Sequence, residues 1–294
     1  MKNIEPQIIH LPKILDLRGN LTFLQHPDHL PYSIQRAYWI YDVPGGEIRG
    51  GHAFKEQNEF IIAISGSFDV VIDQGESEKI YSLNRSYVGL HIPPGKWRTI
   101  QNFSTNSLAL VLASTKFNAA DYIRSYDEYK NFNYNLNNLS TPSYLSEIVS
   151  KISINASKSS INDCKIIELD KKHKEKGNIT VVENRIEVPF DINRVYYLYD
   201  VPGGEERGGH GHKDLYQLIV AAGGSFDVVL NDGVNQKTVT LNRPYQGLYI
   251  VPGIWRELNN FSSGSTSLVL ASNKYEVEDY IRDYEEFKNF KNTI

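Results

Sequence analysis

The chain carries one unit twice, at a fixed offset and without a gap. Every matched pair is 158 positions apart, as His52 and His210 are. Three further pairs show the pattern: Tyr41–Pro44 with Tyr199–Pro202, Gly66–Val71 with Gly224–Val229, and Asp121–Arg124 with Asp279–Arg282. A period this long indicates a duplicated domain rather than a solenoid repeat. The 294 residues suffice for two hydrophobic cores, so the chain must fold as two similar halves.

Each copy is rich in short apolar runs that end at turn signals. In the second copy these runs are Val195–Tyr199, Leu215–Ala222, Val228–Leu230 and Leu248–Val251, each followed by a Gly, Pro or Asn-Asp-Gly sequence. Such spacing predicts an antiparallel sandwich or barrel rather than alternating strands and helices. The Asp-Tyr-Ile-Arg sequence near the end of each copy leads into one predicted short amphipathic helix.

The predicted domains are residues 1–132 and 164–294. An Asn- and Ser-rich linker, residues 133–163, separates them, and Thr141-Pro142 indicates a short helix that runs to Lys151.

Charge and cysteine content narrow the function. A net charge of −4 provides no positive field for nucleic acid or an anionic membrane, so no partner of either kind is expected. The single cysteine, Cys164, excludes an intramolecular disulfide framework and fits a reducing cytoplasm. The polar start, Met1 to Leu11, is unlike a signal peptide, and no apolar run is long enough to span a membrane. We therefore expect a cytoplasmic protein.

A glycine-rich stretch, Gly203–Lys213, contains two histidines, His210 and His212. On a strand both imidazoles would project from one face, which in a barrel can be the interior. A neutral imidazole suits a general base, whereas the structural alternative is a hydrogen-bonded histidine in the barrel wall. The first copy keeps His52 but has Phe54 in place of the second histidine.

The spacing from Gly204 through His210, His212 and Gln217 to Gly224 resembles the first motif of the cupin superfamily. This resemblance implies an all-β protein of two tandem cupin (double-stranded β-helix or jelly-roll) barrels, each with a short C-terminal helix. Metal-binding cupins use two histidines, a glutamate and a later histidine. Here Gln217 and Arg256 occupy the last two positions, and a guanidinium has no lone pair for a metal. In the first copy Phe54 and Arg98 also replace ligands, so we expect no metal in either half.

Three strings, Arg194–Asp200, Arg207–Lys213 and Asp279–Tyr284, narrow the resemblance to the metal-free dTDP-4-keto-6-deoxyglucose 3,4-ketoisomerases. The similarity runs over residues 8–132 and 166–290. It implies a cofactor-free isomerase of a dTDP-linked keto-deoxysugar, whose 3-keto product an aminotransferase uses for surface glycans such as O-antigen. Single-domain members are dimers, so the two copies are expected to form an internal pseudo-dimer; whether a further oligomer forms stays open.

The resemblance implies roles for particular residues. His210 becomes the catalytic base, His212 its partner, and Tyr197 a group of the sugar pocket. An arginine near the nucleotide corresponds to Arg18 in the first copy and to Lys176 in the second.

Charge and ring chemistry add further candidates. Arg207, Arg243 and Arg256 are candidates for the diphosphate because charge-assisted contacts must offset the negative balance of the chain; salt bridging is the alternative. Trp255 can stack on the base or pack in the core.

The first copy retains His52 and Arg49 as a possible site, but Phe54 and Trp39 replace the counterparts of His212 and Tyr197. We favour a scaffold role for this copy over a second enzyme. For the whole chain, a deoxysugar 3- or 3,5-epimerase and a non-catalytic sugar-nucleotide-binding cupin are the alternatives to a ketoisomerase.

Overall fold

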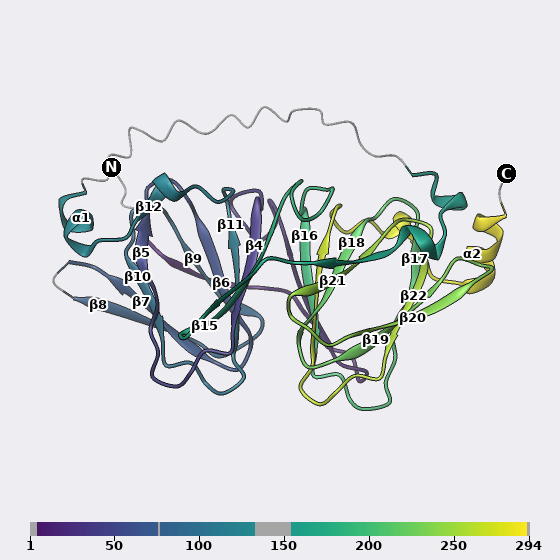
Figure 1. Cartoon of the computed structure of the whole chain (residues 1–294), viewed down its shortest axis with the longest axis horizontal. Coiled ribbons are helices and arrows are strands. Elements are labelled where there is room, and N and C mark those ends of the chain that lie inside the picture. The colour runs from purple at the N-terminus through teal and green to yellow at the C-terminus, as the bar shows by residue number, and fades with distance from the viewer. Residues whose placement is uncertain (1–4, 76, 133–153, 293–294) are drawn as a thin grey trace.

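The computed structural model describes residues 5–75, 77–132 and 154–292, and it contains two barrels, each built of two antiparallel sheets (Figure 1). The first barrel has a seven-stranded sheet in the order β1 (Gln7–His10), β9 (Val88–Ile92), β6 (Glu59–Ser65), β11 (Leu108–Ala113), β4 (Arg36–Tyr41), β15 (Gly177–Glu183) and β14 (Lys171–Lys174). Its five-stranded sheet has the order β12 (Tyr122–Ile123), β5 (Arg49–Phe54), β10 (Arg98–Gln101), β7 (Phe68–Asp73) and β8 (Glu78–Leu83).

The second barrel repeats this plan. Its seven-stranded sheet has the order β13 (Lys165–Glu168), β21 (Gln246–Ile250), β18 (Gln217–Gly223), β23 (Thr266–Ala271), β16 (Arg194–Tyr199), β3 (Asn20–Gln25) and β2 (Lys13–Ile14). Its five-stranded sheet has the order β20 (Gln236–Leu241), β19 (Phe226–Asn231), β22 (Trp255–Asn259), β17 (Arg207–His212) and β24 (Tyr280–Ile281). The prediction of two tandem all-β barrels is confirmed.

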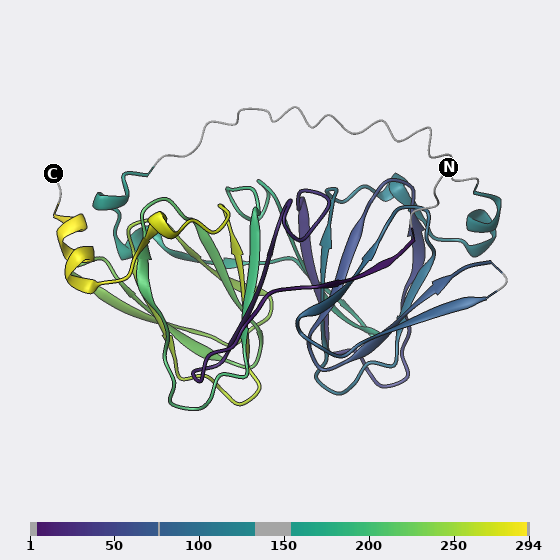
Figure 2. The same cartoon turned by 180° about the vertical axis from the view of Figure 1, so that it is seen from behind.

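The halves exchange strands. In the second barrel β3 pairs with β16, from Asn20 opposite Tyr199 to Gln25 opposite Arg194. Reciprocally, β15 of the second copy pairs with β4 of the first. Figure 2 shows the purple N-terminal segment running across to the second barrel. Each seven-stranded sheet is therefore continuous across both copies, and each barrel contains a piece of the other.

Local sequence explains the turns and the ends of the helices. Asp232 accepts hydrogen bonds from the backbone N–H groups of Val234 and Asn235 at 3.0 and 2.7 Å, which closes the turn between β19 and β20. Helix α1 (Tyr126–Asn131) and helix α2 (Tyr284–Lys291) follow the Asp-Tyr-Ile-Arg sequences, as predicted. Asp283 caps α2 by accepting from the Glu286 N–H at 2.8 Å. Helix α2 then packs its buried Phe287 against Trp255.

The linker connects to the second barrel through two 3₁₀ turns, η3 (Ala156–Lys158) and η4 (Ile161–Asp163). Lys291 of α2 donates to the carbonyl oxygens of Ala156, Ser159 and Gly253, which fixes this segment to the barrel. The helix predicted from Thr141 to Lys151 lies outside the described residues. Neither described helix has the length and apolar character needed to cross a membrane.

Candidate active site

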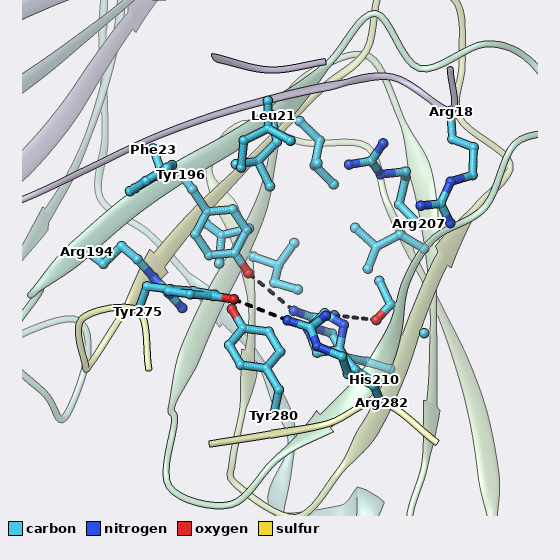
Figure 3. A pocket seen from close by; sticks show the side chains of 18 residues that line it. Arg18, Leu21, Phe23, Arg194, Tyr196, Arg207, His210, Tyr275, Tyr280 and Arg282 are labelled. Atoms are coloured by element: carbon cyan, nitrogen blue, oxygen red, sulfur yellow. Dashed lines mark hydrogen bonds between the residues drawn. The ribbon is translucent and has the colours of Figure 1, made fainter. Parts of the chain in front are cut away.

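A cavity of about 500 Å³ opens into the second barrel, and both copies line it (Figure 3). The second copy contributes most of the lining residues, and the first copy contributes the rest from β2, β3 and the turn before β3. The polar side chains that line the cavity are Arg18, Arg194, Tyr196, Arg207, His210, Arg256, Tyr275, Tyr280 and Arg282. Five guanidinium groups around one imidazole make this cavity suited to an anionic, hydroxyl-rich ligand.

Strand β17 places His210 in the cavity by means of a local irregularity. The register with β22 shifts between Arg207 and His210, and Gly208 has a φ of +92°. A Cβ at Gly208 would lie 2.8 Å from Arg256 Nη1, so only glycine fits at this position. The Nε2 atom of His210 is buried and has no hydrogen-bond partner among the described residues. Burial and the nearby Arg256 charge hold the pKa of His210 well below its usual value, so the imidazole is a free, neutral base near pH 7.

His212 lies directly behind His210 and is paired with a carboxylate. The two imidazole rings meet edge to face with centroids 4.9 Å apart, which confirms that both side chains share one face. His212 Nδ1 donates to Asp279 Oδ2 at 2.7 Å. Burial lowers the pKa of His212 to about 4, although the Asp279 hydrogen bond opposes this shift. Burial alone would raise the pKa of Asp279, but the hydrogen bond with His212 and backbone N–H groups lower it. The pair is therefore a neutral imidazole with Nδ1 protonated, oriented by an ionised carboxylate.

Arg256 belongs to the cavity wall, and its donors are engaged there. Its Nε donates to Gln217 Oε1 at 2.9 Å, its Nη1 to the Gly208 carbonyl at 3.0 Å, and its Nη2 to the Tyr196 hydroxyl at 3.3 Å. Gln217 and Arg256, the two substituted metal-ligand positions, are thus hydrogen-bonded to each other. Nowhere in the described part of the chain do three His, Cys, Asp or Glu side chains converge as a metal site.

The entrance of the cavity holds two neighbouring arginines, Arg18 and Arg207, which lie side by side in Figure 3. Asp16 bridges them, at 2.8 Å from Arg18 Nη2 and 3.6 Å from Arg207 Nη1. The Arg18 hydrogen bonds hold the pKa of Asp16 well below its usual range. Arg207 also donates to the Gly19 carbonyl at 2.6 Å, whereas the Arg18 side chain is 57% exposed and is held by Asp16.

Because the copies exchange strands, each cavity is lined in part by residues of the other copy. Arg18, from the first copy, lies in the cavity with His210. Lys176, from the second copy, lies instead in the other cavity, with His52 and Arg49. The assignment of Lys176 to the His210 site was therefore wrong, because β15 crosses to the first barrel.

Three further predicted contacts with the ligand are corrected by the structure. Tyr197 is fully buried on the opposite face of β16, and its hydroxyl donates to the Ser86 carbonyl of the first copy. Trp255 points away from Arg256, because neighbours on a strand face opposite sides, and packs against Tyr284 and Phe287. Arg243 is exposed in a turn and does not line the cavity.

Six polar residues in or directly behind the cavity were not predicted from the sequence. These are Arg194, Tyr196, Tyr275, Asp279, Tyr280 and Arg282. All but Tyr275 recur unchanged in the first copy, as Arg36, Tyr38, Asp121, Tyr122 and Arg124. Identity between the copies at polar positions was the signal available. Figure 3 shows Tyr196, Tyr275 and Tyr280 on the side of the cavity opposite Arg18 and Arg207.

Fold and site together define a tandem cupin-type double barrel whose cavity combines an unpartnered imidazole, an imidazole–carboxylate pair and an arginine-lined entrance. The family model described as "FdtA: WxcM-like, C-terminal" matches residues 4–134 and again residues 162–292. The chain therefore belongs to this family, with one member domain in each half.

Proteins of the size of one half match just under half of this chain. A TDP-4-oxo-6-deoxy-alpha-D-glucose-3,4-oxoisomerase from Aneurinibacillus thermoaerophilus is 42% identical over 126 residues, which cover 43% of this chain and 91% of that protein. A crystal structure of a 3,4-ketoisomerase from Helicobacter canadensis is 46% identical and covers 45% of this chain and 98% of that one, with a TM-score of 0.44. The sugar 3,4-ketoisomerase QdtA from Thermoanaerobacterium thermosaccharolyticum, in complex with TDP, is 38% identical over 44% of this chain and 95% of that one, with a TM-score of 0.44.

Proposed function

We propose that the second-half cavity converts TDP-4-keto-6-deoxyglucose into the corresponding 3-keto sugar nucleotide without a metal or other cofactor. The observation that carries this proposal is His210. Its Nε2 is buried, neutral and unpartnered, and it faces a cavity in which arginines and tyrosine hydroxyls can hold a sugar nucleotide. The related proteins described above, which act on or bind such nucleotides, support the substrate class.

The reaction needs one carbon base and donors for the oxygens. The C3 proton lies alpha to the C4 carbonyl, so His210 Nε2 takes this proton while the electrons of the C–H bond move onto the C4 oxygen. Hydroxyl and guanidinium donors on Tyr196, Tyr280 and Arg282 surround the cavity and stabilise the enediolate. The O3–H proton passes to the C4 oxygen through the cavity hydroxyls, and His210 returns its proton to C4 as the C3 carbonyl forms. Proton and electron count balance, and no oxidant is consumed.

His212 and Asp279 act behind His210 rather than on the sugar. His212 does not line the cavity, but its ring contacts both His210 and Tyr280, at centroid distances of 4.9 and 4.4 Å. The carboxylate fixes the ring orientation and the tautomer of His212, and His212 in turn fixes His210 and Tyr280. These two groups are therefore positioning residues in the proposed mechanism.

The diphosphate fits the entrance. Arg18 and Arg207 together present a forked donor array, and a diphosphate that displaces Asp16 from Arg18 would gain bidentate contacts. Arg18 comes from the other copy, so the proposed site is complete only when both copies are present. This supports the internal pseudo-dimer as the functional unit of the chain.

The test is a turnover assay in D₂O with TDP-4-keto-6-deoxyglucose, followed by NMR. We expect a 3-keto product with deuterium at C4, and deuterium at C3 in any 4-keto sugar that is formed back from the enediolate. His210→Ala should lower the rate by a factor on the order of 10² to 10⁴, whereas the matched His52→Ala variant should keep most of it. A sugar that keeps its 4-keto group but is inverted at C3 would identify an epimerase. Binding of TDP without any exchange of sugar protons for deuterium would identify a sensor. Either result would refute the isomerase proposal.

A further inference from the structure

The first barrel contains a second cavity, of about 720 Å³, that retains the polar lining of the first. Seven of its side chains are of the same type as their counterparts around His210: Arg36, Tyr38, Arg49, His52, Arg98, Tyr122 and Arg124. The Trp39 substitution, which pointed to a lost pocket group, lies outside this cavity, because Trp39 donates from Nε1 to the Pro244 carbonyl at 2.8 Å in the contact between the halves. The cavity of the first barrel has therefore lost fewer polar groups than the sequence of the first copy indicates.

One element of the reacting centre is absent from this cavity. Phe54 fills the position of His212, and its ring contacts His52 at 4.8 Å. Asp121, the counterpart of Asp279, still accepts the Glu56 N–H through Oδ1, but its buried Oδ2 has no partner among the described residues. Burial raises the pKa of Asp121, which is the opposite of the shift at Asp279. His52 is thus an unpartnered imidazole without the imidazole–carboxylate pair behind it.

The entrance, in contrast, is rebuilt for an anion. Lys172, Lys174 and Lys176 alternate along and just beyond β14 and line the cavity, whereas Ile14, Asp16 and Arg18 hold the equivalent places in the other half. Lys174 replaces the carboxylate that bridges Arg18 and Arg207. Within the described part of the chain, Arg49 consequently has no carboxylate within 4 Å.

Carboxylates in this cavity, and Glu47 beside it, offset only part of this charge. Asp170 lies 3.7 Å from Lys172, and Glu47 lies 3.1 Å from Lys176. Two further lining carboxylates are engaged locally: Glu183 accepts the Phe117 N–H at 2.9 Å, and Glu187 accepts the Glu183 N–H at 2.7 Å. Lys174 forms no ion pair with any described residue and remains available to a ligand.

We infer that the first-half cavity is a second nucleoside-diphosphate-sugar site, which binds its ligand through Arg49 and the three lysines but does not isomerise it. The ligand class rests on the function proposed for the second half. Binding follows from the retained lining and the cationic entrance. The lack of turnover follows from Phe54, which leaves His52 without the second imidazole.

Calorimetric titration of the full chain with TDP tests this inference. Wild-type protein should bind two TDP molecules per chain. Arg18→Glu and Lys174→Glu reverse a charge at an exposed position of each entrance, and each should weaken one site by about 10- to 100-fold while the other persists. The double variant should lose both. Circular dichroism melts verify that each variant is folded.

Two results would overturn the inference: one TDP per chain in the wild type, or a Lys174→Glu protein that binds like the wild type. The readout is independent of turnover. A chain that binds two TDP but does not isomerise the 4-keto sugar would refute the proposed reaction and leave this second site standing. A chain that isomerises the sugar but binds one TDP would refute the second site and leave the proposed reaction standing.

Discussion

The hydrogen bond between Asp279 and His212 allows a sharp test of the proposed mechanism. The two carboxylate oxygens of Asp279 have separate tasks, since Oδ1 accepts the Asp214 N–H and Oδ2 accepts His212 Nδ1, both at 2.7 Å. Asparagine offers one acceptor oxygen, so Asp279→Asn must lose one of these bonds whichever way the amide is oriented. A hydrogen bond to a charged group is worth about 1.5–3 kcal/mol. If this free energy is expressed in the transition state, kcat falls by about 10- to 150-fold.

Because Asp279 does not line the cavity, KM should change little. The factor by which kcat falls should also be the same at every pH between 6 and 8. His212 already has a pKa of about 4, and the hydrogen bond to Asp279 raises this pKa. Its removal lowers the pKa further, so the ring stays neutral in both proteins. Initial rates of isomerisation measured by NMR at several substrate concentrations and pH values provide the test.

The duplication supplies a matched control. Asp121→Asn changes the equivalent carboxylate, whose Oδ2 has no partner among the described residues, and should leave kcat as it is in the wild type. The converse change, Phe54→His, gives Asp121 the donor that it lacks. In a His210→Ala background it should raise isomerisation above that of His210→Ala alone. An Asp279→Asn enzyme with kcat within twofold of wild type, or an Asp121→Asn enzyme as impaired as Asp279→Asn, would refute the reasoning.

Three further outcomes are expected. Turnover should survive prolonged EDTA treatment, since Gln217 and Arg256 replace two metal ligands; activity lost on chelation and restored by a transition metal would contradict this. Tyr196→Phe should lower kcat by about tenfold because it removes a cavity hydroxyl, whereas Tyr197→Phe should only destabilise the fold by about 1–3 kcal/mol, as denaturant unfolding would show. The folded-state pKa of His212, about 4, lies below an unfolded value near 6.5, so acid favours the unfolded chain. Between pH 7 and pH 5 the wild type should lose about 2 kcal/mol of unfolding free energy that a His212→Phe variant keeps, and equal losses in both would disprove this assignment.

Short stretches of the sequence are enough to predict the local features of this protein. The gapless repeat specified two equivalent barrels, and turn residues such as Asp232 fixed where strands end, because backbone conformation at a turn depends on its own few residues. The His-x-His spacing predicts that both imidazoles lie on one face, because every second side chain of a strand points the same way.

Which residues come together in the two cavities depends on how the strands of the two copies pair. Strands β4 and β16 present equivalent edges, so the sequence does not say which of them β3 or β15 will join, and the exchange of strands brings Arg18 to His210 and Lys176 to His52. Every residue of β16 is buried, so no alternation of polar and apolar residues marks the face that Tyr196 shares with the cavity or the face on which Tyr197 meets the other half. Strand partners and buried faces are set by contacts distant in sequence, and a local pattern carries no record of them.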